Sequence, residues 1–84
     1  MTGPVAVTVE VTVPEIGADG PIRVGQWLVA AGERTSEGDR LVELVADGVL
    51  WNVPSPAAGT VLPPRLAAGR TARVGETLGT IRPD

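Results

Sequence analysis

Glycine and proline are spread so evenly along this chain that a helix has no room to form. The 84 residues include eleven glycines and eight prolines, and no stretch free of both is longer than nine residues. Inside a helix a glycine costs about 1 kcal/mol and a proline about 3 kcal/mol relative to alanine. The sequence therefore predicts an all-β chain of short strands joined by turns.

The apolar segments between these turn residues have the period of β-strands. Residues 5–13 read VAVTVEVTV, with valine at every odd position. Because alternate side chains of a strand point to opposite faces of a sheet, this pattern predicts a strand with one buried face. Further extended segments are bounded by glycine, proline or charged residues and bring the predicted number of strands to six; they cover 22–31, 41–46, 49–53, 60–66 and 78–82.

An internal repeat divides the chain into two similar halves. Residues 29–44 match residues 66–81 without gaps at an offset of 37, and the identical pairs are Ala30/Ala67, Ala31/Ala68, Gly32/Gly69, Gly38/Gly75 and Leu41/Leu78. Two copies are too few for a solenoid, but they suffice for the two halves of one β-sandwich. We expect one domain over 1–84, with halves at about 5–46 and 49–82 related by a pseudo-twofold axis.

Two details of this repeat can be compared directly with a structure. The paired glycines should lie at turn positions that need positive φ. Upstream, Val13-Pro14 matches Val53-Pro54 at an offset of 40. This second offset predicts that the first loop of the second half is three residues shorter than its counterpart.

Asp47-Gly48 lies between two apolar segments at the centre of the chain. An Asp-Gly pair in this setting is a strong hairpin signal, because a type I′ turn needs φ > 0 at both of its central residues. We expect residues 47–48 to form the hairpin tip that joins the two halves.

Missing residue types exclude several classes of function. The chain has no histidine, cysteine or lysine, which rules out the usual zinc sites, Ser/His and Cys/His nucleophile pairs, disulfides, Schiff bases and P-loops. The net charge is −3 and the seven arginines are scattered, which argues against nucleic-acid binding. Residues 1–4 lack signal-peptide features and no apolar run is long enough for a membrane helix, so we expect a cytoplasmic chain without membrane contact.

Five segments of the chain resemble the lipoyl domains of 2-oxo acid dehydrogenase acyltransferases: VPEIG (13–17), WLVAAGE (27–33), GDRLVEL (38–44), NVPSPAAGTV (52–61) and VGETLGTI (74–81). The resemblance covers about residues 7–82 in both order and spacing. It implies a flattened β-sandwich, or barrel-sandwich hybrid, of two four-stranded sheets with internal pseudo-twofold symmetry. This architecture agrees with the repeat described above.

In the family that this chain resembles, a lysine at the tip of the central hairpin carries lipoate through an amide, typically within a Glu-Thr-Asp-Lys-Ala string. Biotinyl domains use the same place. The resemblance puts Gly48 at the lysine position, flanked by Asp47 and Val49, with Val45 and Ala46 in place of the family's glutamate and threonine. The only primary amine of the printed chain is its N-terminus, which by family geometry lies far from the tip, so we expect no bound cofactor.

The origin of this change is open between a natural departure and a lysine replaced artificially. A deliberate exchange of one lysine would leave the neighbouring tip residues intact. Here several tip positions differ together and lysine is absent from the whole chain. The pattern favours a natural departure.

The arms of the hairpin are unusually apolar and allow two interpretations. In the first, Trp51 packs in the core and Leu50 is a single exposed leucine. In the second, the tip is a docking surface for a protein partner or a second copy, because tryptophan is enriched at binding hot spots. The candidate surface consists of Val45, Ala46, Leu50 and Trp51.

Structural roles explain the other candidate residues best. Trp27 is expected to pack in or beside the core. Glu43 and Asp47, four residues apart, are expected on a solvated strand edge instead of acting as a catalytic pair. Ser55 lies in a Pro-Ser-Pro turn with no base to activate it. We therefore predict no catalytic residue and no metal site.

Together these inferences predict a lipoyl-domain-like module without an acceptor lysine. Its expected role is a non-catalytic protein-interaction or scaffolding domain, and not an enzyme. The alternative is the swinging-arm carrier domain of a 2-oxo acid dehydrogenase acyltransferase or related complex, whose lysine was replaced.

Overall fold

The computed structural model describes residues 7–84, and these residues form eight strands and no helix. Val5 and Ala6 of the first predicted strand lie outside the described residues. The strands are β1 (Val9–Thr12), β2 (Ile22–Trp27), β3 (Arg34–Thr35), β4 (Arg40–Ala46), β5 (Val49–Pro54), β6 (Gly59–Val61), β7 (Thr71–Ala72) and β8 (Thr77–Pro83). The all-β prediction is confirmed, and across residues 7–84 no helix exists that could cross a membrane.

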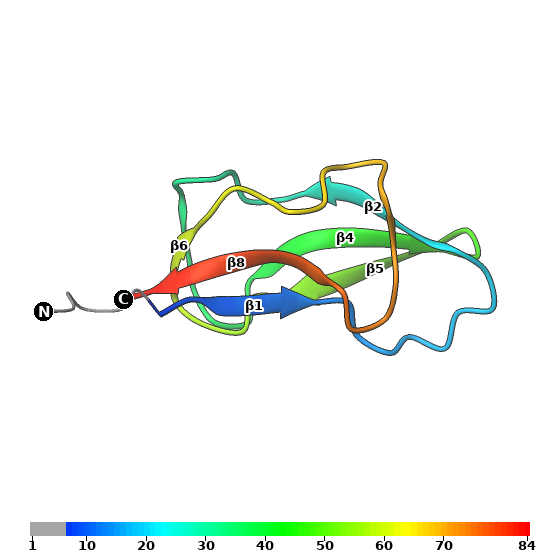
Figure 1. Cartoon of the computed structure of the whole chain (residues 1–84), viewed down its shortest axis with the longest axis horizontal. Helices are drawn as coiled ribbons and strands as arrows, with labels where there is room; N and C mark the ends of the chain where they lie inside the picture. Colours follow the sequence, from blue (N-terminus) through cyan, green and yellow to red (C-terminus); the bar gives the residue numbers. More distant parts are fainter. Residues whose placement is uncertain (1–6) are drawn as a thin grey trace, which may run out of the picture.

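The eight strands form two antiparallel sheets of four strands each, with the orders β1-β8-β6-β3 and β5-β4-β2-β7. Figure 1 shows β8 and β1 in one layer beside β4 and β5 in the other. The alternating apolar residues of both sheets meet between the layers and make one core; its most buried members include Val11, Val24, Leu41, Val42, Leu44, Val61, Leu78 and Ile81. The flattened sandwich implied by the resemblance is confirmed.

The internal repeat corresponds to a structural repeat. Adding 37 to the bounds of β3 and β4 gives the bounds of β7 and β8, and the same offset carries the start of β2 to the start of β6. When each strand is replaced by its counterpart, the order β5-β4-β2-β7 becomes β1-β8-β6-β3, so the two sheets have the same arrangement. The paired glycines adopt nearly equal positive φ angles, as predicted: Gly32 90° and Gly69 91°, Gly38 90° and Gly75 85°.

The pairing of the strands corrects the offset of 40 that was predicted upstream of the repeat. Val9 lies opposite Ile81 in one sheet, and Trp51 lies opposite Leu44 in the other. Since Leu44 and Ile81 correspond at 37, Val9 corresponds to Trp51 at an offset of 42, and the predicted offset of 40 is wrong. The first loop, 13–21, is matched by the loop 55–58, so the second half is shorter by five residues and not by three.

The identical pair Leu41/Leu78 occupies a matching irregularity in the two sheets. The pairing of β4 with β5 skips Leu41, and the pairing of β1 with β8 skips Leu78, so each leucine sits at a β-bulge. Both leucines are fully buried. The bulge turns each leucine into the core together with its neighbour, Val42 or Gly79, which are also buried.

The predicted strands differ from the observed ones at five segments. The first predicted strand, 5–13, is a strand only at Val9–Thr12 within the described residues, and Val7 is 67% exposed. The two-residue strands β3 and β7 were not among the six predicted strands, because two residues are too few to show a period. The predicted strands 22–31 and 60–66 end early, at Trp27 and Val61. Their apolar continuations, which include Val29 and Leu66, lie in turns and pack against the core from there.

Candidate functional site

The central hairpin ends in the turn that the sequence predicts. Ala46 of β4 pairs with Val49 of β5, and the two residues between them have positive φ, 52° for Asp47 and 74° for Gly48. Positive φ at both central positions is the signature of a type I′ turn. Figure 1 shows this turn at one end of the molecule, opposite the end where the C-terminus lies. The predicted separation of the N-terminus from the tip concerns residues outside the described range.

The loop between β1 and β2 packs against this tip, a contact that the sequence did not predict. Oδ2 of Asp47 accepts a hydrogen bond of 3.1 Å from the backbone N–H of Asp19. A Cβ added at Gly20 would lie 2.9 Å from Oδ1 of the same carboxylate. Ile16 and Ala18 of this loop pack against the core. Asp47 therefore ties a long loop to the turn, and the absence of a side chain at Gly20 permits the close approach.

Position 48 is open to solvent. A Cβ built on Gly48 meets no atom within 4 Å, so a side chain placed there would project freely away from the domain. Its φ of 74° is nevertheless in the region where residues other than glycine are strained. The turn thus offers space for a side chain while its backbone favours glycine.

The apolar surface in the structure consists of partly different residues from the predicted one. Ala46 is only 2% exposed and does not belong to any surface, and Val45 is half-buried. Trp51 is 39% exposed, so the interpretation that it packs in the core is wrong. Leu50 is 63% exposed, and Val49, which was not among the predicted surface residues, is 49% exposed. We call Val49, Leu50 and Trp51 the β5 patch.

The position of β5 in its sheet explains this exposure. Val49 and Trp51 lie opposite Ala46 and Leu44, which are buried, so both side chains are on the inner face as alternation predicts. However, β5 is the outermost strand of its sheet. No strand within residues 7–84 flanks its outer side, and the inner-face side chains near the tip stay partly in solvent.

The polar candidates make hydrogen bonds within the domain. Glu43 accepts a hydrogen bond of 3.3 Å from Nε2 of Gln26, and Asp47 binds the loop instead of Glu43. Ser55 is buried, and its Oγ donates to the carbonyl of Ala57 at 2.8 Å, which shapes the turn after β5. Among residues 7–84 no three potential metal ligands cluster together.

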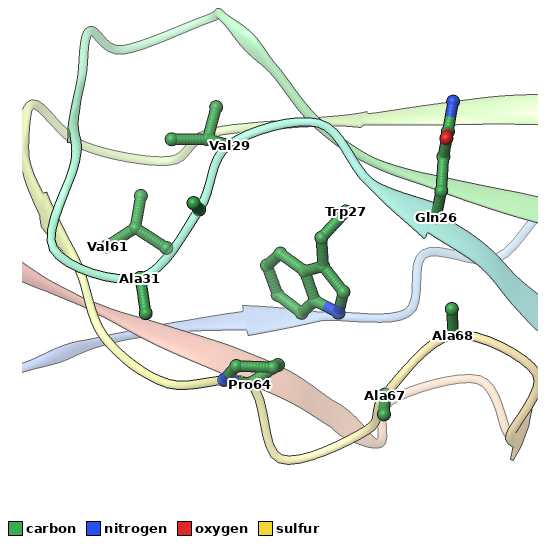
Figure 2. A pocket seen from close by; sticks show the side chains of 9 residues that line it. Gln26, Trp27, Val29, Ala31, Val61, Pro64, Ala67 and Ala68 are labelled. Atoms are coloured by element: carbon green, nitrogen blue, oxygen red, sulfur yellow. The ribbon is translucent and has the colours of Figure 1, made fainter.

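A separate apolar pocket of about 420 Å³ opens around Trp27. Its walls combine the repeated alanines of both halves with a few neighbours: Gln26, Val29, Ala30, Ala31, Val61, Pro64, Ala67 and Ala68. Figure 2 shows the indole pointing into the space between the two repeated loops. Nε1 of Trp27 donates to the carbonyl of Leu66 at 2.9 Å, and a Cβ at Gly79 would lie 2.8 Å from the ring. Trp27 is half-buried and joins the two sheets, which agrees with its predicted packing role, and none of the residues 45–51 lines the pocket.

Removing the Asp47 carboxylate should loosen the loop without unfolding the domain. We expect Asp47→Ala to lower the free energy of unfolding by about 1 kcal/mol, through loss of one hydrogen bond and less tolerance of positive φ. Hydrogen exchange at the Asp19 amide should accelerate. Asp47→Asn keeps an acceptor oxygen and tolerates the same φ, and so serves as the control. Equal exchange rates at Asp19 in the two variants would contradict this role.

Comparison with known proteins gives a consistent result. A family model described as "Biotin-requiring enzyme" (biotin/lipoyl) matches residues 9–81. The dihydrolipoyllysine-residue acetyltransferase component of the pyruvate dehydrogenase complex of Azotobacter vinelandii is 36% identical over 73 residues, which are 87% of this chain and 11% of that protein. The dihydrolipoyllysine-residue succinyltransferase component of the 2-oxoglutarate dehydrogenase complex of Bartonella vinsonii subsp. berkhoffii is 36% identical over 75 residues, 88% of this chain and 18% of that protein.

A solved structure shares the fold. The solution structure of the lipoyl domain of the 2-oxoglutarate dehydrogenase complex from Azotobacter vinelandii matches with a TM-score of 0.64 at 26% identity. The match covers 90% of this chain and 95% of that domain. The chain thus corresponds to nearly all of one solved lipoyl domain, but it spans less than a fifth of the two curated relatives.

Proposed function

This chain belongs to the biotin/lipoyl attachment domain family, and from that premise we propose that it is a lipoyl-type module without an acceptor lysine, acting as a non-catalytic protein-interaction or scaffolding domain. The observation that carries the proposal is the hairpin tip. Its turn presents Gly48, where family members of the lipoyl type present the modified lysine. An amide to a lipoyl or biotinyl group requires an amine, and the printed chain has no lysine at any position.

The geometry of the hairpin tip supports the loss of an attachment residue at position 48, and not the transfer of the attachment site to another position. A side chain at position 48 would stand free in solvent, as an attachment residue requires. The residue at this position is nevertheless Gly48, which has no side chain. Asp47 and Gly48 both have positive φ angles, which suit a tight turn. Once a swinging arm is absent, the property left to the tip is recognition by other protein surfaces, and the exposed β5 patch is suited to that role.

The second candidate is a carrier domain whose lysine was replaced. It is favoured by the similarity to acetyltransferase and succinyltransferase components of dehydrogenase complexes. Under this proposal the native gene encodes lysine at position 48 and the module carries acyl groups in a larger assembly. The two candidates differ in one measurable property, the covalent state of the native protein.

Intact mass separates the two proposals. We expect the chain, expressed with lipoate and a lipoate ligase and separately with biotin and a biotin ligase, to keep the mass of the bare polypeptide. The chain isolated from its native cell should have that same unmodified mass. A prosthetic group on the native protein, or a native gene with lysine at position 48, would refute the non-carrier proposal.

Restoring the lysine alone should not restore efficient modification. We expect Gly48→Lys to be lipoylated poorly, because Val45 and Ala46 still differ from the family's tip and the lysine bears positive-φ strain. The variant with Val45→Glu, Ala46→Thr and Gly48→Lys together is the matched control and should be modified to a several-fold greater extent. Efficient lipoylation of Gly48→Lys alone would show that the tip remained a substrate in every respect except the amine.

A further inference from the structure

The four outermost strands of the two sheets are protected unequally. An edge strand has unpaired backbone N–H and C=O groups, and proteins usually protect such edges by short length or charged side chains. β3 and β7 contain two residues each, and β1 carries Glu10 within its four residues. β5 has six residues from Val49 to Pro54, none of them charged.

The pseudo-twofold symmetry makes this difference sharper. β1 and β5 occupy equivalent places in the two sheets, and the offset of 42 derived from strand pairing aligns their residues. Glu10 of β1 corresponds to Asn52 of β5, and the exposed Thr8 corresponds to the exposed Leu50. The same architectural position therefore carries a charge in one half of the molecule and a neutral, apolar edge in the other.

We propose that β5 pairs antiparallel with β5 of a second copy and joins the two β5-β4-β2-β7 sheets into one continuous sheet. An extended strand is the partner that satisfies a row of unpaired backbone groups. The partner is a second copy because β5 is self-complementary. In a register centred on Trp51, the two tryptophans face each other, Leu50 lies opposite Asn52, and Val49 lies opposite Val53, so no charges oppose each other.

The strand itself restricts the register of this pairing. Pro54 has no N–H, so the hydrogen-bonded ladder cannot extend past Val53, and at the other end the Asp47-Gly48 turn ends the strand. The midpoint between these limits is Trp51. An antiparallel pair of identical strands is an isologous contact, so association closes at a dimer. Each copy has a net charge of −3, so two copies repel each other overall. Contact through the uncharged β5 keeps this repulsion low.

Sedimentation of the 84-residue chain tests this proposal, which rests on the proposed role as an interaction module. Because the contact is short, we expect a dissociation constant on the order of 100 µM. Sedimentation should therefore be measured at protein concentrations from about 10 µM to about 1 mM. The mass should rise from that of one 8.6 kDa chain to that of two. Amide exchange of β5 should slow with concentration over the same range.

Two charge variants identify the surface. Leu50→Arg places a charge on the β5 edge and should weaken association about tenfold or more, although it brings the net charge closer to zero. Thr8→Arg makes the same charge change at the equivalent place beside β1 and should leave association unchanged. Both positions are exposed, so both variants should keep the thermal unfolding temperature of the unaltered chain.

Several outcomes would overturn the proposal. These are a chain that stays monomeric at 1 mM, assemblies larger than a dimer, equal effects of the two variants, or capture of a different protein's strand by β5 without self-association. A monomeric chain with the bare polypeptide mass would leave the proposed function standing and refute only this inference. A lipoylated native chain would refute the proposed function and leave the dimer to be decided by sedimentation.

Discussion

Gly59→Ala is expected to remove most of the stability of the domain. A Cβ at this position would lie 2.1 Å from the carbonyl oxygen of Arg82 and 2.8 Å from Cα of Pro83. Both atoms belong to the backbone of β8, which pairs with β6 at this point, so no side-chain rotation can relieve the clash. We expect a loss of at least about 4 kcal/mol, which is most of the stability of a domain this small.

Urea denaturation followed by tryptophan fluorescence measures this loss, with Gly69→Ala as the matched control. Gly69 has a φ of 91°, but a Cβ there would meet no atom within 4 Å. Its replacement should cost only the backbone strain, about 1–2 kcal/mol. If the two variants unfold at the same urea concentration, the close approach of β6 and β8 is not what requires a glycine at position 59.

Truncating either leucine of the Leu41/Leu78 pair is expected to cost about 3–5 kcal/mol, the usual range for a fully buried leucine replaced by alanine. Both side chains are 0% exposed and sit at equivalent bulges of the two sheets. The pseudo-twofold symmetry therefore predicts that Leu41→Ala and Leu78→Ala have similar costs. Calorimetry or urea denaturation of the two variants gives both values.

Leu28 provides the comparison for this pair. It is 38% exposed, so Leu28→Ala should change the free energy of unfolding by less than about 1 kcal/mol. A difference of more than about 2 kcal/mol between Leu41→Ala and Leu78→Ala would mean that the two cores relax differently around the cavities, and that the symmetry of the backbone does not extend to packing.

Local pattern was enough to predict much of this fold. The Asp-Gly pair and the offset of 37 depend on residues close in sequence or on direct repetition, and both are confirmed. The strand predicted from the alternating valines is confirmed over Val9–Thr12. The offset of 40 failed because it relied on a recurring Val-Pro pair, whereas equivalence in a sheet is decided by which residues face each other across the ladder. A short identity cannot report on that pairing.

The candidate site was harder to predict because it depends on what covers each face. Alternation correctly assigned Trp51 to the inner face, but only the strand order shows that β5 is an edge where that face remains partly in solvent. Ala46 was predicted at the surface as part of the apolar arms of the hairpin, yet it lies on the inner face of β4, opposite the buried Ile22 of β2. The contact between Asp19 and Asp47 joins residues 28 positions apart, and no local signal marks it.

The pairing of β1 with β8 also constrains how the domain can be made. Val9 lies opposite Ile81, so the ladder joins residues from nearly the two ends of the described chain. On a ribosome, β1 emerges early and waits until β8 has been synthesised, whereas β4 and β5 meet across a two-residue turn as soon as both have left the exit tunnel. Until then the valines of β1 have no partner strand, and a nascent chain at that stage carries an apolar segment open to chaperones.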